Sequence, residues 1–217
     1  MVLKGRACMD CNVAENINIL AKFLGTRDID ALNQEELFNR YGIHQVDVMV
    51  LFGGSILEGG DVLASGIKNF VAKKYIIVGG AGHTTDTLRQ VVHLEYPDIE
   101  TTDLSEAEIF QKYIKHVYGC KADYLETKST NCGNNITYLL DLLKENNISF
   151  KSIILSQDAS MQRRMAAGLK KYVKEDVTII NYATYCAKVL NQDEDLVFED
   201  NIHGMWSINR YVNLLMG

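Results

Sequence analysis

Short apolar runs, separated by amphipathic stretches, dominate the middle of the chain. Near-continuous apolar character, rich in Val, Ile or Tyr, occurs at 47–52, 75–78, 122–126, 152–155 and 177–182. Such runs are typical of buried strands in a parallel sheet that is covered on both of its faces. The pattern therefore predicts a set of buried parallel strands.

Stretches with helical periodicity separate these strands, at 61–74, 87–96, 105–119, 134–147 and 160–173. The first has an apolar stripe made of Val62, Leu63, Ile67, Phe70 and Val71. In the third, Ser105 and Glu108 have the spacing of a capping box, and Gly119 is placed as a C-terminal cap. Residues 12–41 are also mostly helical in pattern, and 204–217 are expected to form a closing helix.

Alternation of strand and helix predicts an α/β fold with a Rossmann-like, doubly wound and mainly parallel sheet of about five strands. We expect residues 45–185 to form this ligand-binding domain. The flanks, 1–44 together with 186–217, are expected to form a smaller, mostly helical subdomain that packs on it.

In a doubly wound sheet, ligands bind beyond the carboxyl ends of the strands, near a switch in strand order. Four of the segments that follow the predicted strands are glycine-rich or densely polar: 53–60, 79–86, 127–135 and 156–164. The third contains STNCGNN at 129–135, which has more polar residues than the cap of the next helix requires. The sequence therefore predicts a binding site at this edge of the sheet.

The candidate ligand-binding residues are Gly53, Gly54, Gly79, Gly80, Gly82, His83, Glu106, Ser129, Thr130, Asn131, Asn134, Gln157, Asp158, Arg163 and Arg164. Paired glycines allow positive φ and close approach, and they offer N–H donors to an anion, although they also serve in tight turns. Arg163 and Arg164 lie near a helix N-terminus, where an anionic ligand would explain two cations; one solvated and one ion-paired arginine is the alternative.

Catalytic roles are not fixed by the sequence, and the candidates are His83, Asp158 and Glu106. His83 follows a glycine pair in a loop, as an acid–base or ligand-contacting histidine would, but a surface histidine is equally compatible. Glu106 has a second explanation in its favourable position in the first turn of a helix. The other four histidines are expected to be structural: His44, His93, His116 and His203.

Charge and composition exclude several classes of protein. The net charge of −6 argues against a nucleic-acid partner, which usually requires a basic surface. No apolar run reaches the roughly 18 residues of a membrane span, and the N-terminus lacks a signal-peptide pattern, so a cytoplasmic location is expected. The five cysteines, an odd number, fit a reducing compartment better than a disulfide framework.

Several sequence motifs are incomplete. Cys8 and Cys11 form C-x-x-C without a second pair, so no metal site is expected, and Cys132 has no evident partner base. The GxGxxT beginning at Gly80 lacks the third glycine of a dinucleotide-binding motif. A P-loop is absent, and Leu57 stands where a nucleophile elbow requires glycine.

Five segments, in this order, resemble the YdcF-like family of bacterial proteins: VGGAGHTT, SEAEIF, STNCGNN, QDASMQRR and GMWSINRYVNLL. The wider family includes the envelope proteins SanA and ElyC, and the resemblance extends from about residue 12 to the end. It implies a Rossmann-type fold with a smaller, mostly helical subdomain. It also implies binding of S-adenosylmethionine in a cleft at the strand ends. This agrees with the reading of the residues, because the ligand has a carboxylate that Arg163 or Arg164 could bind.

Two functional hypotheses follow, and the sequence does not decide whether the protein is an enzyme. The first is a cytoplasmic protein that binds S-adenosylmethionine or a related nucleotide with an anionic group, with a transferase role left open. The chain lacks the acidic-plus-glycine signature that follows the first strand of common methyltransferases, since Asp47 begins that strand. The second is an enzyme acting on a phosphorylated substrate, a sugar nucleotide or an envelope precursor. A scaffold that binds a protein partner is a third reading.

Overall fold

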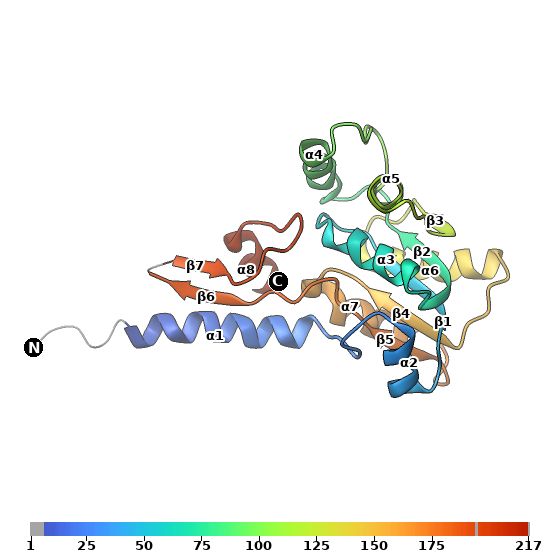
Figure 1. Ribbon diagram of the computed structural model, residues 1–217, viewed down its shortest axis with the longest axis horizontal. Coiled ribbons are helices and arrows are strands. Elements are labelled where there is room, and N and C mark those ends of the chain that lie inside the picture. Colours follow the sequence, from blue (N-terminus) through green and yellow to red (C-terminus); the bar gives the residue numbers. More distant parts are fainter. Residues whose placement is uncertain (1–6, 194, 217) are drawn as a thin grey trace, which may run out of the picture.

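The computed structural model describes residues 7–193 and 195–216 (Figure 1). The helices in this part of the chain are α1 (Ala7–Leu24), α2 (Gln34–Tyr41), α3 (Glu58–Lys68), α4 (Thr85–Glu95), α5 (Glu106–Tyr118), α6 (Cys132–Glu145), α7 (Ala159–Lys170) and α8 (Ile208–Met216). The strands are β1 (Val46–Phe52), β2 (Ala72–Val78), β3 (Tyr124–Glu126), β4 (Ser152–Ser156), β5 (Thr178–Asn181), β6 (Val189–Gln192) and β7 (Asp195–Phe198).

Strands β1 to β5 form one parallel sheet in the order β3-β2-β1-β4-β5. In the centre, Val48 of β1 pairs with Lys74 of β2 on one side and with Ile153 of β4 on the other. The chain winds outward from β1 to β3 and then returns to the other side of β1, so the switch point lies between β1 and β4. The predicted Rossmann-like α/β fold is confirmed.

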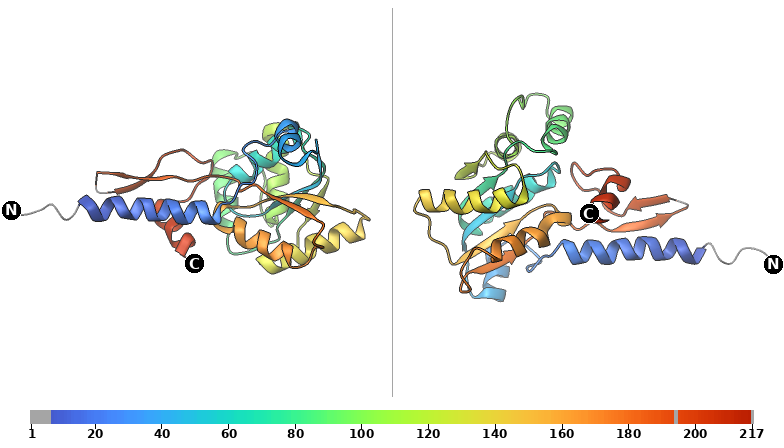
Figure 2. Two further views of the ribbon diagram at one scale, coloured as in Figure 1. Left: turned by 90° about the horizontal axis from the view of Figure 1, so that it is seen from below. Right: turned by 180° about the vertical axis from the view of Figure 1, so that it is seen from behind.

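Helices cover both faces of this sheet, which explains why its central strands are apolar on both faces. Met49 and Leu51 of β1 point into a core shared with Leu63 of α3. The alternate residues Val48 and Val50 point into a second core, shared with α6 and α7. Figure 2 (left) shows α2 and α3 on one side of the sheet and α6 and α7 on the other. Burial on both faces removes the usual alternation of polar and apolar residues.

A second unit extends from the end of the sheet, on the left of Figure 1. It consists of α1, the antiparallel hairpin β6–β7 and α8, whose side chains share a third core around Ala21 and Tyr211. The flank predicted as mostly helical thus contains a hairpin; Val189–Gln192 pairs with Asp195–Phe198, and Asp193 takes φ 57° at the turn. The stretch 26–44 packs elsewhere, because Leu32 and Leu37 belong to the core of the main sheet.

The helix expected over 61–74 ends early, at Lys68. Phe70 has φ 53° and is 65% exposed, so it does not continue the predicted apolar stripe. Val71 is buried, and its carbonyl accepts a hydrogen bond from Val46 N (2.9 Å) at the start of the β1–β2 ladder. Pairing with β1 therefore takes residues 72–78 into a strand.

Candidate functional site: an acidic pocket at the switch point

A cavity of about 310 Å³ lies beyond the carboxyl ends of β1, β2 and β4. The sequence-predicted residues that line it are Gly53, Gly54, Gly79, Gly80, Gly82, His83, Glu106, Ser129, Thr130, Asn131, Gln157 and Asp158. They come from five separate segments of the chain: four follow β1 to β4, which the parallel sheet brings to one edge, and the fifth is Glu106 at the start of α5. We call this cavity the acidic pocket, because two carboxyl groups form its floor.

The predicted residues Asn134, Arg163 and Arg164 do not line the acidic pocket. The Asn134 side chain is hydrogen-bonded to Asn131, the N-cap of α6. Arg163 Nη1 donates to Phe23 O (3.2 Å) on α1, and its guanidinium carbon lies 3.9 Å from the centre of the Phe23 ring.

The arginines miss the pocket because of helix geometry. Ser160 and Met161 at the start of α7 face the cavity. At about 100° per residue, Arg163 and Arg164 return to roughly the face of Ser160, but they lie about one turn, ~5 Å, further along α7 and away from the pocket. Proximity to a helix N-terminus in sequence was therefore not enough to place their side chains in the site.

Two carboxyl groups form the floor of the pocket, and each residue is only 7% exposed. Glu106, the first residue of α5, accepts hydrogen bonds from the hydroxyls of Thr84 (2.7 Å) and Thr85 (3.1 Å). Asp158 directly precedes α7. Among the residues that the structure describes, none donates a hydrogen bond to the Asp158 carboxyl, which is unusual for a group so deeply buried.

Burial shifts the proton affinity of both groups. Loss of hydration raises the pKa of Glu106, and the two threonine hydroxyls offset only part of this effect. Burial, together with the nearby charge of Glu106, raises the pKa of Asp158 to about 7. The floor therefore exchanges a proton near neutral pH and becomes more negative as the pH rises.

The glycines of the pocket make room for these carboxyls. A Cβ atom at Gly53 would lie 2.5 Å from Glu106 Oε2, and one at Gly54 would lie 2.6 Å from Asp158 Oδ2. A Cβ at Gly80 would overlap the backbone oxygen of Ser129. Positive φ, one predicted reason for these glycines, occurs at other glycines of the described chain and not here. Close approach is the reason that the structure supports.

The predicted glycine N–H donors are largely used by the protein itself. Gly53 N donates to Val78 O (2.6 Å), Gly79 N to Glu126 O (2.9 Å) and Gly80 N to Ser129 O (2.9 Å). Gly82 N donates to Thr85 Oγ1 (2.7 Å). These four donors already have acceptors within the protein, so anion binding by the glycine N–H groups stays a prediction.

Other predicted residues divide into supporting and accessible groups. Gln157 is held on both ends of its amide: Nε2 donates to Gly53 O (3.1 Å), and Oε1 accepts from Asp158 N (2.7 Å). It therefore positions Asp158. Thr130, Asn131 and His83 are exposed at the mouth of the pocket, where their polar groups can meet a ligand.

One wall of the pocket comes from the C-terminal end of the chain, which the sequence reasoning missed. Trp206, Arg210 and Leu214 line the cavity from α8 and the segment before it. The Arg210 guanidinium carbon lies 5.1 Å from the centre of the Trp206 ring. Among the described pocket-lining residues, Arg210 is the one arginine or lysine. The signal available was a single tryptophan preceding an amphipathic helix.

Five further residues that line the pocket escaped prediction, and all are sequence neighbours of predicted ones: Thr84, Cys132, Asn135, Ser160 and Met161. They lie in the segments that follow β2, β3 and β4. The strand-end rule thus identified the correct segments and left open which side chains turn inward.

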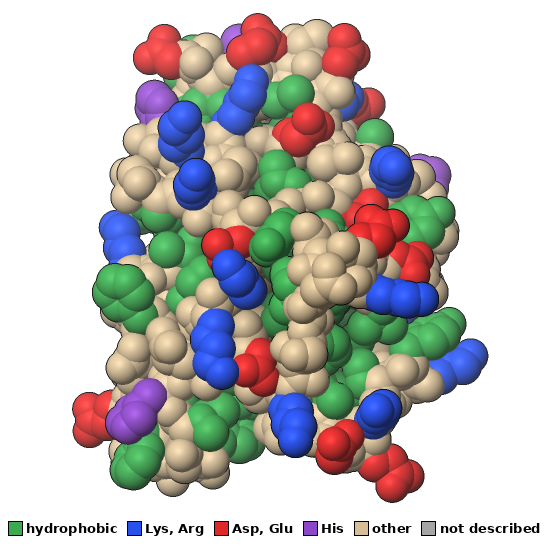
Figure 3. Space-filling model, turned by 90° about the vertical axis from the view of Figure 1, so that its right-hand side faces the viewer, with side chains coloured by type: hydrophobic (Ala, Val, Ile, Leu, Met, Phe, Trp, Pro, Cys, Tyr) green, Lys and Arg blue, Asp and Glu red, His purple; other side chains and the backbone are tan. Residues whose placement is uncertain are grey.

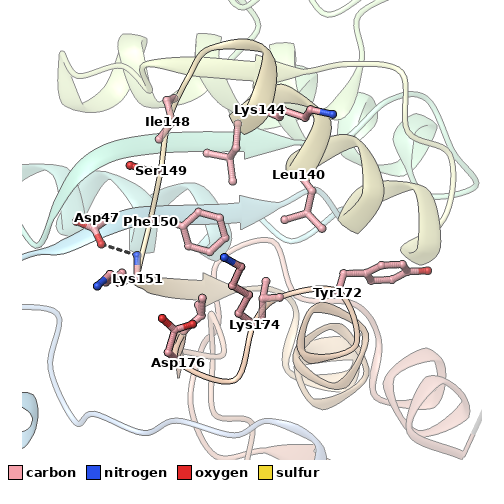
Figure 4. Close-up of a pocket in the computed structure, with 13 residues that line it drawn as sticks. Asp47, Leu140, Lys144, Ile148, Ser149, Phe150, Lys151, Tyr172, Lys174 and Asp176 are labelled. Carbon is pink, nitrogen blue, oxygen red and sulfur yellow. Dashed lines mark hydrogen bonds between the residues drawn. The ribbon is translucent and has the colours of Figure 1, made fainter.

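Another cavity, of about 590 Å³, opens at the opposite edge of the sheet (Figure 4). Its lining is mostly apolar with lysine side chains, and one of its two carboxylates, Asp47, accepts from Lys151 N (2.8 Å). On that side of the molecule, Lys and Arg side chains are interspersed with Asp, Glu and apolar side chains and form no single basic patch (Figure 3). None of the sequence-predicted site residues lies there.

Within the described ranges, no cluster of three or more His, Cys, Asp or Glu side chains is placed to hold a metal ion. The side chains of Cys8 and Cys11 lie outside the described residues. None of the helices in the described chain is both long enough and apolar enough to cross a membrane. No model of a known protein family matches the sequence.

Proposed function

We propose that the acidic pocket binds a nucleoside with an attached amino-acid group and a cationic centre, of which S-adenosylmethionine is the representative. The observation that carries this proposal is the charge layout of the cavity. Two buried carboxyls, Glu106 and Asp158, form its floor, and Arg210 stands in the wall. A ligand with a positive centre and a separate carboxylate matches both parts.

The remaining lining suits the rest of such a molecule. The Trp206 ring offers an aromatic surface for a base, and Thr130 and Asn131 offer hydrogen-bonding groups for hydroxyls or base edges. S-adenosylmethionine is also the ligand implied by the resemblance of five sequence segments to the YdcF-like family. The anionic contact expected from Arg163 or Arg164 is reassigned to Arg210, since Arg163 and Arg164 lie outside the cavity.

A phosphorylated substrate is the weaker candidate for the same pocket. Its phosphate would face two carboxyls on the floor, and like charges placed together at low hydration are unfavourable. The N–H groups of Gly53, Gly79 and Gly80, which could have bound a phosphate, already donate to backbone carbonyls. Release of phosphate from sugar nucleotides or prenyl phosphates would nevertheless identify this activity directly.

If the protein is a transferase, the carboxyl groups of the floor are the candidates for its proton-transfer steps. A general base works best when its pKa lies near the working pH, as that of Asp158 does. Glu106 holds its proton more firmly than an exposed glutamate, because burial raises its pKa. His83 lies at the exposed mouth of the pocket, so it is better placed than the floor carboxyls to contact a second substrate.

Calorimetry with three related ligands tests the proposal. S-adenosylmethionine carries a sulfonium charge, S-adenosylhomocysteine lacks it, and methylthioadenosine lacks the amino-acid group as well. We expect affinity to fall in that order. Equal affinity for all three, or no heat at high micromolar ligand, would contradict the proposed charge recognition.

The pH dependence supplies an independent test of the floor. Asp158 becomes a carboxylate as the pH rises through about 7, so affinity for S-adenosylmethionine should increase over that range. Asp158→Asn should remove most of this increase and weaken binding at alkaline pH by about five- to thirtyfold. Asp176→Asn, at an exposed aspartate of the opposite edge, is the matched control and should behave as the wild type.

A further inference from the structure

The segment 202–216, here called the C-terminal strap, closes one side of the acidic pocket. It contributes Trp206, Arg210 and Leu214 to the lining. Its other face is fixed to the second unit, because Tyr211 and Leu215 are buried in the core shared with α1 and the hairpin. The strap therefore connects the hairpin unit to the ligand-binding edge of the main sheet (Figures 1 and 2).

His203 anchors the strap to the helices beside the sheet. Its Nδ1 lies 2.7 Å from Asp61 Oδ2 on α3, and its Nε2 lies 2.7 Å from Glu95 Oε2 on α4. A neutral imidazole has only one N–H group, so it can donate to only one of these carboxylates. Hydrogen bonds to both require the doubly protonated, charged ring.

Backbone contacts transmit this anchorage to the pocket. Glu58 N donates to His203 O (3.1 Å), and at Gly204 (φ 73°) an added Cβ would lie 2.8 Å from Leu57 N. The next anchor is Trp206, whose Nε1 donates to the Ser55 hydroxyl (2.8 Å). Ser55 follows directly on the glycine pair Gly53–Gly54 of the pocket, so release of the strap would reach the site itself.

The titratable groups that face His203 come from three helices: Glu58 and Asp61 on α3, Glu95 and Tyr96 on α4, and Tyr113 and Tyr118 on α5. Tyr113 and Tyr118 both donate to Asp61 Oδ1, which leaves Asp61 Oδ2 for the histidine. The nearest cation to this cluster in the described contacts is Lys68, over the Tyr118 ring at 4.5 Å. The surroundings are thus acidic and favour the charged imidazole.

Burial by itself lowers the pKa of His203, but the hydrogen bonds and charges of Asp61 and Glu95 outweigh it and raise the pKa above its ordinary value. A raised pKa means that the anchorage is complete below the ordinary imidazole pKa of about 6.5. It is lost as the pH rises through the raised value. The window also has a lower limit, because carboxylates that become protonated at low pH no longer attract the charged imidazole.

We propose that His203 is a proton-controlled anchor, which holds the C-terminal strap against the acidic pocket when charged and releases it when neutral. This inference concerns access to the pocket and does not depend on the identity of the ligand. If the pocket does not bind S-adenosylmethionine, the anchor proposal is unaffected, because its own test needs no ligand.

Trp206 makes the strap directly observable, because it is the single tryptophan of the chain. We expect one transition in the intrinsic fluorescence of the full-length protein between about pH 6 and about pH 9. Above its midpoint, the emission should shift to longer wavelength and acrylamide should quench it more, since Trp206 leaves the pocket wall and the Ser55 hydrogen bond.

Four variants identify the group that titrates. His203→Gln should abolish the transition, and Glu95→Gln should keep it but lower its midpoint, because one of the two carboxylates that raise the pKa is neutralised. His83→Gln and Asp158→Asn remove two of the other titratable groups that line the pocket with Trp206, and both should keep the transition.

The absence of a fluorescence transition in the wild-type protein would overturn the proposal. A transition that persists in His203→Gln, or that disappears in His83→Gln or Asp158→Asn, would overturn it as well. If His203→Gln does not fold, the midpoint in Glu95→Gln decides, because Glu95 is an exposed residue at the end of α4. An unchanged midpoint in that variant would exclude the anchor.

Discussion

At the scale of single residues, the pocket depends on glycines that pack directly against buried carboxyl groups. Glu106 and Asp158 are accommodated because Gly53 and Gly54 have no side chains in their way. Each carboxyl is thereby held at the carboxyl end of β1, where the switch point makes the cavity. A glycine pair and an acidic residue about fifty or one hundred positions later thus form one structural feature.

The pocket glycines should differ in their response to alanine. Gly54→Ala places a methyl group against the Asp158 carboxyl, which can rotate, so we expect weaker binding of S-adenosylmethionine with a small loss of stability. Gly80→Ala meets the backbone oxygen of Ser129, which cannot move freely, and should lower the free energy of unfolding by about 1–3 kcal/mol.

Gly82→Ala is the control for both changes. Its Cβ would meet only Thr130 O, at 3.8 Å, although Gly82 also lines the pocket. Urea denaturation and calorimetry on the three variants separate the two effects. Equal behaviour of Gly54→Ala and Gly82→Ala would show that the close approach to Asp158 has no consequence for binding.

At the scale of elements, α5 fixes one carboxyl of the floor through its first turn. Ser105 Oγ accepts from Glu108 N (3.3 Å), and Glu108 Oε2 accepts from Ser105 N (2.9 Å), so the predicted capping box is present. Gly119 ends the helix with φ 68°, as its position predicted. Glu106 lies inside this box, and its orientation toward the pocket depends on where the helix begins.

Removing the cap should therefore affect both stability and the site. Ser105→Ala should lower the free energy of unfolding by about 1 kcal/mol, because Glu108 N loses its side-chain acceptor and the Glu108 carboxylate loses the Ser105 hydroxyl that donates to it. We also expect weaker binding of S-adenosylmethionine, since the start of α5 places Glu106. Ser105→Thr keeps the hydroxyl and is the matched control. A stability loss of the same size in both variants would mean that the methyl group or the packing, and not the cap, is responsible.

At the scale of the whole molecule, the two edges of the sheet have different tasks. The carboxyl edge carries the acidic pocket, whereas the opposite edge is fixed by Asp47 at the start of β1. Asp47 accepts from Lys151 N (2.8 Å), Ser152 N (3.1 Å) and Lys73 Nζ (2.8 Å), and so joins β1 to both of its neighbours. Asp47, at the beginning of β1, therefore has a structural role. An aspartate at the other end of the strand would instead lie beside the pocket.

Asp47→Asn should destabilise the fold and leave the ligand site unchanged. Burial raises the pKa of Asp47, but the hydrogen bonds from Lys73, Lys151 and Ser152 outweigh burial and lower the pKa overall. The stabilisation is therefore present above the ordinary carboxyl pKa of about 4 and is lost as the pH falls through the lowered value.

In urea denaturation at neutral pH, we expect Asp47→Asn to lower the free energy of unfolding by about 1–2 kcal/mol. This difference from the wild type should shrink as the pH falls toward about 3. The dissociation constant of S-adenosylmethionine should stay at the wild-type value. Asp141→Asn, at an exposed position on α6, is the control for stability. A changed dissociation constant in Asp47→Asn would show that the two edges are coupled.

The sequence by itself determined the five strands of the parallel sheet, their alternation with helices, and the edge at which the acidic pocket lies. These features follow from local patterns: apolar runs covered on two faces, helical periodicity, caps at Ser105 and Gly119, and polar residues after successive strands. The early end of α3 was not determined locally, because pairing of β2 with the distant β1 decides it. The β6–β7 hairpin pairs near neighbours in the sequence, and the prediction of a mostly helical flank missed it.

Only the tertiary structure decided which side chains face the pocket. Arg163 lies one turn further along α7 and donates a hydrogen bond to Phe23 of α1, and the return of the C-terminal strap brings Arg210 to the site from the far end of the chain. His203, expected to be structural, lies between Asp61 and Glu95 for the same reason. Sequence patterns encode what each segment buries. Which distant segment meets it depends on how all the elements pack together, and no local pattern contains that information.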